Sequence, residues 1–196
     1  MKKILVSLLL VIAMASAAFA VEYGATGYES EGYDEEHAWE ISSAETLVKV
    51  RNDVNNGKVR AGSCFKFTND IDMTGLDYEN WTPINITTAQ DFTFDGGNKT
   101  ITVRMVHQHD DVGLFGNISK GTIKNLSVTG SIRGLSPFMD VNVGGIVAKL
   151  DGGTIDNCTF DGKVVAAEGW YEYAGGIAGK TGGSVVKITN CKVGSN

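Results

Sequence analysis

A repeat of about 32 residues constrains this 196-residue chain more than any other feature. Residues 113–132 and 145–164 align with six identities: Gly113/Gly145, Gly121/Gly153, Thr122/Thr154, Ile123/Ile155, Asn125/Asn157 and Gly130/Gly162. A third copy begins at Gly176 and continues with Ile188, Asn190, Cys191 and Val193. Each copy reads as two short strands joined by a glycine turn and followed by a variable loop. Such a unit indicates one coil of a solenoid.

The repeat contains no helical pattern, which argues against ankyrin, tetratricopeptide and leucine-rich architectures, and it is shorter than a propeller blade of about 40–45 residues. We therefore predict an all-β fold, a right-handed parallel β-helix whose equivalent side chains stack about 4.8 Å apart. Two inward ladders are expected, Ile123–Ile155–Ile188 and Leu126–Cys158–Cys191. The row formed by Asn125, Asn157 and Asn190 is expected to bond its neighbours at a bend rather than to bind a ligand.

The residues before the coils divide into three parts. Lys2 and Lys3, an apolar run and an Ala18–Ala20 cleavage pattern make residues 1–20 a signal peptide, which predicts a secreted or cell-surface protein. Residues 21–38 are rich in acidic side chains and are interpreted as a flexible linker. Residues 39–63 are expected to form a cap.

The cap contains the clearest helical pattern of the chain. Ser42 and Glu45 fit a capping box, Gly57 fits a C-terminal stop, and between them three apolar residues share one helical face: Leu47, Val50 and Val54. We expect this short helix to close the N-terminal end of a β-helix domain over residues 39–196. The coils would span residues 64–196, with repeats near 112–132, 143–164 and 174–196.

The net charge of the chain limits the classes of partner that we expect it to bind. The formal net charge is −6, and removal of Lys2 and Lys3 with the signal peptide makes it −8. Nucleic acid and anionic membrane surfaces attract basic proteins, so we expect neither as a partner. No later stretch approaches 18 consecutive apolar residues, so membrane insertion is not expected.

Several segments in this order resemble the exported bacterial proteins that carry the GLUG motif. They are Trp39–Ser43, Phe67–Met73, Asn80–Ile84, Phe94–Ile101 and Val112–Gly116, followed by the later Gly-Gly-Ile and Ile-x-Asn-Cys elements. The resemblance implies a right-handed β-helix of bacterial surface proteins, adhesin-like chains among them, and it implies no catalytic residues. Ala148 stands where the motif usually has glycine.

Three groups of side chains invite a chemical interpretation. His107, His109 and the two following aspartates could ligate a metal, but a polar turn explains them equally well. Asp70 and Asp72 could hold calcium with Asp77, or could cap turn amides. We expect no metal and no cofactor.

The cysteines leave two alternatives open. Cys158 and Cys191 share one repeat position, so adjacent coils would place them near enough for a disulfide. An inward ladder of small apolar thiols is the other alternative.

Function is expected along one edge of the solenoid, where three loops follow equivalent strands: His107–Asp111, Arg133–Asn142 and Val165–Tyr173. The candidate binding residues are His107, His109, Phe138, Trp170, Tyr171 and Tyr173. They could form a platform for a glycan or a host or cell-surface protein, or could fold back and seal the flank. A binding platform of this kind predicts a non-catalytic, adhesin-like binding module. The alternative function is that of a carbohydrate-active enzyme or the carbohydrate-binding remnant of one. Self-association through an uncapped C-terminal coil is also expected.

Overall fold

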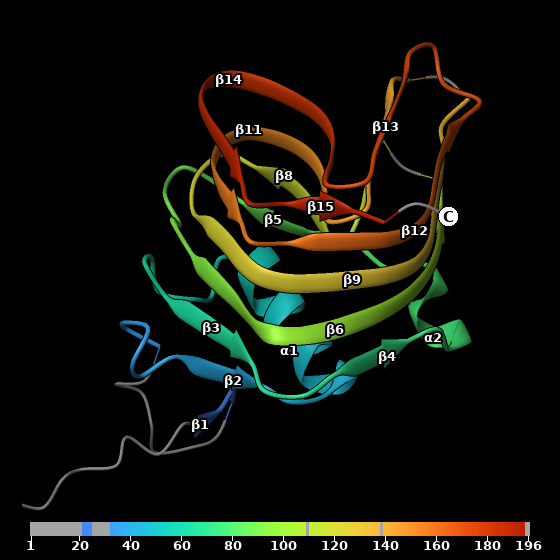
Figure 1. Cartoon of the computed structure of the whole chain (residues 1–196). Helices are drawn as coiled ribbons and strands as arrows, with labels where there is room; N and C mark the ends of the chain where they lie inside the picture. The colour runs from blue at the N-terminus through green and yellow to red at the C-terminus, as the bar shows by residue number, and fades with distance from the viewer. Residues whose placement is uncertain (1–20, 25–31, 109, 138, 195–196) are drawn as a thin grey trace, which may run out of the picture.

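The repeat folds as predicted, into a parallel β-solenoid of about four turns (Figure 1). The structure is a computed structural model that describes residues 21–24, 32–108, 110–137 and 139–194. Successive coils stack on one another through parallel strand pairs, and the chain rises through them in a right-handed sense. The predicted fold class is thereby confirmed.

Long strands bend around the corners of the coils, so that one strand contributes to two walls. The first part of the chain forms β1 (Val21–Glu22), β2 (Trp39–Ile41), α1 (Ala44–Asn55), β3 (Cys64–Phe67), β4 (Ile71–Met73), α2 (Leu76–Glu79) and β5 (Ile84–Ile86). The later coils form β6 (Thr93–His107), β7 (Asp111–Val112), β8 (Phe115–Ile118), β9 (Thr122–Leu135), β10 (Val141–Gly144), β11 (Val147–Asp156), β12 (Thr159–Ala167), β13 (Glu172–Gly175), β14 (Ala178–Thr189) and β15 (Lys192–Val193).

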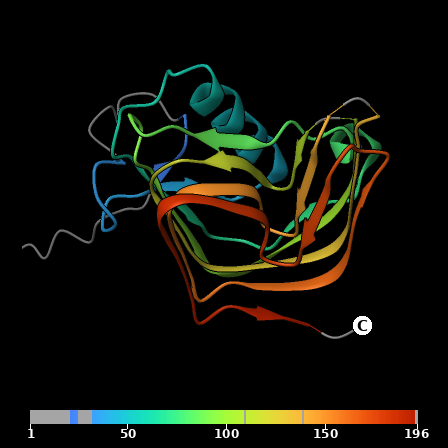
Figure 2. The ribbon, with the colours of Figure 1, turned by 90° about the horizontal axis from the view of Figure 1, so that it is seen from above.

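Two walls matter for the site. In one, β7, β10 and β13 form a separate three-stranded sheet. In the other, β5 and β8 stack against the beginnings of β11 and β14. From above, β10 and β13 run inward from the far right toward the middle and meet the second wall at an angle (Figure 2).

The core is built from the predicted ladders. Ile123 pairs with Ile155, and Ile155 with Ile188, while Phe65 and Phe94 continue the same row into the earlier coils. The rings of Phe65 and Phe94 stack with their centroids 4.7 Å apart. Ile123 and Ile155 are buried, but Ile188, in the last described coil, is 40% exposed. Val193, in β15 of the same coil, is exposed as well, and self-association at this end remains a prediction.

Asparagine turns each coil at one corner. Asn125, Asn157 and Asn190 have φ angles of 54°, 50° and 55°, a left-handed conformation that asparagine tolerates better than most residues. Asn125 donates from Nδ2 to Oδ1 of Asp95 over 3.0 Å, which ties its corner to the coil before it. The predicted structural role of this row is confirmed.

Glycine is required at a second corner because the coils touch there through their backbones. A Cβ atom on Gly153 would lie 2.5 Å from the carbonyl oxygen of Gly121, the equivalent residue one coil earlier. Both glycines also have positive φ angles, 90° and 110°. Their identity in the repeat therefore follows from stacking geometry.

The predicted capping helix is present as α1. Its N-cap is Ser43 rather than Ser42, because the Oγ of Ser43 accepts the N–H of Thr46 over 3.2 Å. Leu47, Val50 and Val54 are buried, as their spacing predicts.

The end of α1 covers the first strand of one wall. Asn55 donates from Nδ2 to the carbonyl of Pro83 and accepts the N–H of Asn85 on Oδ1, each over 2.9 Å. The helix thus satisfies backbone groups that a further strand would otherwise occupy. Among the described residues, no helix is long and apolar enough to cross a membrane.

The described part of the segment expected to be a linker belongs to the folded unit. Val21 pairs with Trp39 in a parallel ladder, and Tyr23 packs its ring against Trp39 and Phe65. Tyr23 also donates from its hydroxyl to Oδ2 of Asp53 over 3.1 Å. The acidic composition of residues 21–38 concealed these aromatic contacts.

Candidate functional site

The three variable loops lie one above another, as expected. The strand registers align Val106 with Arg133 and Val165 before the loops, and Asp111 with Asn142 and Tyr173 after them. We call these stacked connections the loop edge.

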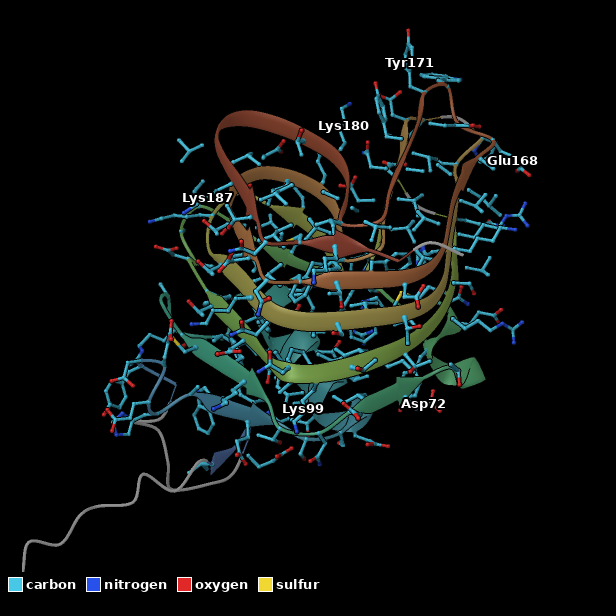
Figure 3. The ribbon with its side chains drawn as sticks, viewed as in Figure 1. Asp72, Lys99, Glu168, Tyr171, Lys180 and Lys187 are labelled. Atoms are coloured by element: carbon cyan, nitrogen blue, oxygen red, sulfur yellow. The ribbon has the colours of Figure 1, made fainter. Side chains whose placement is uncertain are left out.

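Two aromatic residues of the loop edge are turned to solvent. Trp170 is 73% exposed and Tyr171 66%, so neither is folded back as a seal on the flank. Figure 3 shows Tyr171 at the tip of the connection between β12 and β13, pointing away from the solenoid. The backbone N–H of Trp170 donates to the carbonyl of Met139 over 3.0 Å, which ties two neighbouring loops together.

The other candidate residues differ in their positions. His107 is only 8% exposed and lines a separate pocket with Glu79, Asn80 and Gln108, away from the exposed aromatic pair. His109 and Phe138 lie outside the described residues. Tyr173 is partly buried, and the ammonium group of Lys180 lies 4.2 Å from the centre of its ring.

A polar groove lies beside the loop edge, where the two walls meet. One side carries the outward row Asp111–Asn142–Tyr173 of β7, β10 and β13. The other carries Lys149 of β11 and Lys180 of β14, which are in register with each other. Because side chains alternate in a strand, the neighbours of Asn142 (Val141 and Val143) and of Lys149 (Ala148 and Leu150) face the core and are buried.

The groove has a volume of about 360 Å³, within the usual range of about 300–1,000 Å³ for small-molecule pockets. We define the polar groove by its lining residues: Asp110, Asp111, Met139, Asp140, Asn142, Lys149, Trp170 and Lys180. A second hollow of about 240 Å³ shares Asp110 and Asp111 and extends toward Asn85. The two hollows together follow the solenoid axis across neighbouring coils.

Opposite charges are interleaved in the groove. Lys149 donates to Asp151 over 2.7 Å, and Lys180 lies 4.0 Å from Asp140. The hydrogen bond to Asp151 raises the pKa of Lys149, burial lowers it, and the charges of Asp151 and Asp111 raise it further. The net shift is upward, so Lys149 is a cation at neutral pH.

Asn142 occupies the middle of the groove and is 6% exposed. Its Nδ2 donates to Oδ1 of Asp111 over 2.7 Å, and its Oδ1 is buried without a hydrogen-bond partner among the described residues. Buried side-chain oxygens are nearly always hydrogen-bonded, so this acceptor stands out.

The aspartates that suggested calcium hold protein groups instead: Asp72 caps its own turn, whereas Asp70 reaches strand β6 of the next coil. Asp70 accepts the N–H of Thr100, and Asp72 accepts both the N–H and the hydroxyl of Thr74. The side chain of Asp77 lies outside the described part of the structure. Within the described ranges, no three His, Cys, Asp or Glu side chains gather as a metal site. The thiols of Cys158 and Cys191 are free.

Sequence reasoning found the exposed aromatic pair and missed the groove beside it. Asn142, Lys149 and Lys180 line it, and nothing in the type or spacing of these three residues predicts a ligand site. One signal was available: Asn142 lies between Val141 and Val143, and this alternation marks it as the outward residue of a buried strand.

Fold and groove together define the chain as a parallel β-solenoid with a polar groove beside an exposed aromatic edge. The GLUG motif matches residues 140–165, which coincide with the second copy of the repeat. No curated protein matches the chain.

Among solved structures, the fold is similar to a crystal structure from Bacteroides ovatus described as a "putative immunoglobulin A1 protease". The TM-score is 0.60 at 21% sequence identity, and the match covers 83% of this chain and 58% of that one. This chain therefore spans less than two thirds of that protein. At this identity the likeness concerns the fold alone.

Proposed function

We propose that the chain is an exported, non-catalytic β-solenoid module that binds a glycan or a surface protein through its loop edge, in the manner of an adhesin. The exposure of Trp170 and Tyr171 carries this proposal, because solvent-facing aromatic pairs are characteristic of interaction sites. The signal-peptide pattern of residues 1–20 and the GLUG motif support an extracellular setting.

The solenoid supplies a rigid base for such a site. The connection that carries Trp170 and Tyr171 is short and lies between two strands that are paired in register with the coil below. Its backbone is tied to the neighbouring loop, because Trp170 donates its N–H to the carbonyl of Met139 and the carbonyl of Tyr171 accepts the N–H of Val141. Rigid presentation lowers the entropy that binding would otherwise cost.

The test is the substitution Trp170→Ala, followed by a glycan array, adhesion to cell surfaces and thermal unfolding. Removal of an aromatic anchor typically costs about 2 kcal/mol of binding, which corresponds to about 30-fold in affinity. Stability should change by no more than about 0.5 kcal/mol, because the side chain is exposed. Val185→Ala, at an exposed residue of β14 outside the loop edge, is the matched control.

Loss of stability together with unchanged binding would overturn the proposal. The description of the B. ovatus neighbour makes proteolysis the activity to check directly. Incubation of the mature protein with immunoglobulin A1, and separately with acidic and neutral polysaccharides, should leave each of them intact. Cleavage of any of them would overturn the non-catalytic part of the proposal.

A further inference from the structure

The unpartnered amide oxygen of Asn142 identifies a ligand position in the polar groove. Folded proteins rarely leave such a buried acceptor without a donor. The side-chain nitrogen of Asn142 is already used by Asp111, and this contact fixes which end of the amide accepts. A donor that enters the groove would complete the hydrogen bonding of Asn142.

The surrounding groups favour a ligand that both donates and accepts hydrogen bonds within a few ångströms. Asp111 and Asp140 offer carboxylate oxygens, whereas Lys149 and Lys180 offer ammonium protons. A sugar ring suits this lining, since each hydroxyl is a donor and an acceptor at once. Trp170, at the rim, supplies an apolar face for the C–H side of such a ring.

The net negative charge of the groove favours neutral sugars over acidic ones as ligands. Three carboxylates and two ammonium groups line the groove, and the chain as a whole is acidic. An added carboxylate on the ligand would meet a net negative surface. From these features we infer that the groove binds a neutral saccharide, with one hydroxyl donating to Oδ1 of Asn142 and the ring resting against Trp170. The inference rests on the proposed function and names its ligand class.

The experiment titrates the mature protein with four neutral hexaoses (cello-, malto-, xylo- and mannohexaose) and with oligogalacturonate, using calorimetry and NMR of the Asn142 side-chain amide. We expect saturable binding of at least one neutral hexaose, a shift of that amide resonance, and no binding of oligogalacturonate. Asn142→Leu should weaken the binding at least tenfold, and so should Asp140→Asn. Lys163→Met, at an exposed residue of β12 away from the groove, should leave it unchanged.

Two variants keep the result interpretable. Asn142 is buried, so Asn142→Leu could disturb folding, whereas the side chain of Asp140 is 42% exposed and lies outside the core, so its replacement leaves the core intact. If sugar binding survives both substitutions but is lost in Trp170→Ala, the groove inference is overturned and the proposed function stands. Binding of oligogalacturonate alone, or of a protein surface but no hexaose, also overturns it. If Trp170→Ala binds cell surfaces and hexaoses like the unchanged protein, the proposed function fails as well.

Discussion

Asn157 donates a hydrogen bond from Nδ2 to Oδ1 of Asn125, the same residue of the preceding coil, over 2.8 Å. Both residues have a left-handed backbone, so these two side chains set the corners of their coils and join one coil to the other. This contact separates two contributions to stability that usually occur together. One is the backbone conformation, and the other is the hydrogen bond.

Replacement of Asn157 measures both contributions. Asn157→Gly keeps the left-handed conformation but loses the bond, and should lower the free energy of unfolding by about 1 kcal/mol. Asn157→Ala loses the bond and strains the backbone, and should cost about 2 kcal/mol. Denaturant unfolding measures the difference. Equal losses for the two variants would show that the backbone conformation contributes nothing.

The isoleucine ladder predicts a strong dependence on position. Ile155→Asp would bury a carboxylate in the middle of the core and should cost about 4 kcal/mol or more. Ile188→Asp changes the next residue of the same ladder, but its side chain is 40% exposed, so the loss should be about 1 kcal/mol. Thermal unfolding compares the two. Similar melting of Ile155→Asp and the unchanged protein would contradict the register.

We expect low pH to reduce the stability of the last coils, because the carboxylate of Asp156 becomes protonated. Hydrogen bonds from Thr189 and Asn190 hold its pKa below the ordinary 3.8, even though burial raises it. A carboxylate whose pKa is lower in the folded state stabilises that state fully above its unfolded pKa, and the benefit is lost as pH falls through the folded pKa. We expect hydrogen-exchange protection factors in β14 to stay constant from pH 7 to about 4 and to fall below that.

Asp156→Asn provides the control for this pH effect. It removes the charge, so protection in β14 should be lower at neutral pH and should lose its dependence on acid. If the unchanged protein and Asp156→Asn show the same acid profile, another group is responsible.

The free thiols should react in a set order. Burial raises the pKa of Cys158 to about 12, so its reactive thiolate is scarce at neutral pH. Burial also raises the pKa of Cys64, whereas Cys191 lies in the last described coil and is less buried. Alkylation of the native protein, followed by peptide mass spectrometry, should label Cys191 first and Cys158 last. Rapid oxidation of the native protein to a Cys158–Cys191 disulfide would contradict this order.

Much of the fold follows from the sequence because stacking imposes local rules. Gly153 recurs because the coil beneath it leaves no space for a Cβ atom, and Asn157 recurs because its corner needs a left-handed residue. Such constraints repeat with each coil and are visible in one sequence. The N-terminal residues follow no repeat, so the packing of Tyr23 on Phe65 could not be read from composition.

The site was predictable only in part. Exposed aromatics such as Trp170 are visible as variable residues in long loops. The polar groove arises where two walls meet at an angle, and that angle depends on all the corners of a coil together. No spacing in the sequence places Lys180 next to Tyr173, although they are only seven residues apart.

The register of the two groove walls also determines how the site would scale. Each coil adds one outward residue to each wall, as Asn142 follows Asp111 and Lys180 follows Lys149. The groove therefore grows in steps of one strand spacing, about 4.8 Å, and under the proposed saccharide binding the number of coils would set the length of the ligand. At each strand spacing along the groove, the polar or apolar character of the lining is determined by one residue on each wall. A change at a single outward position would thus alter recognition at one point along the ligand while the rest of the groove kept its selectivity.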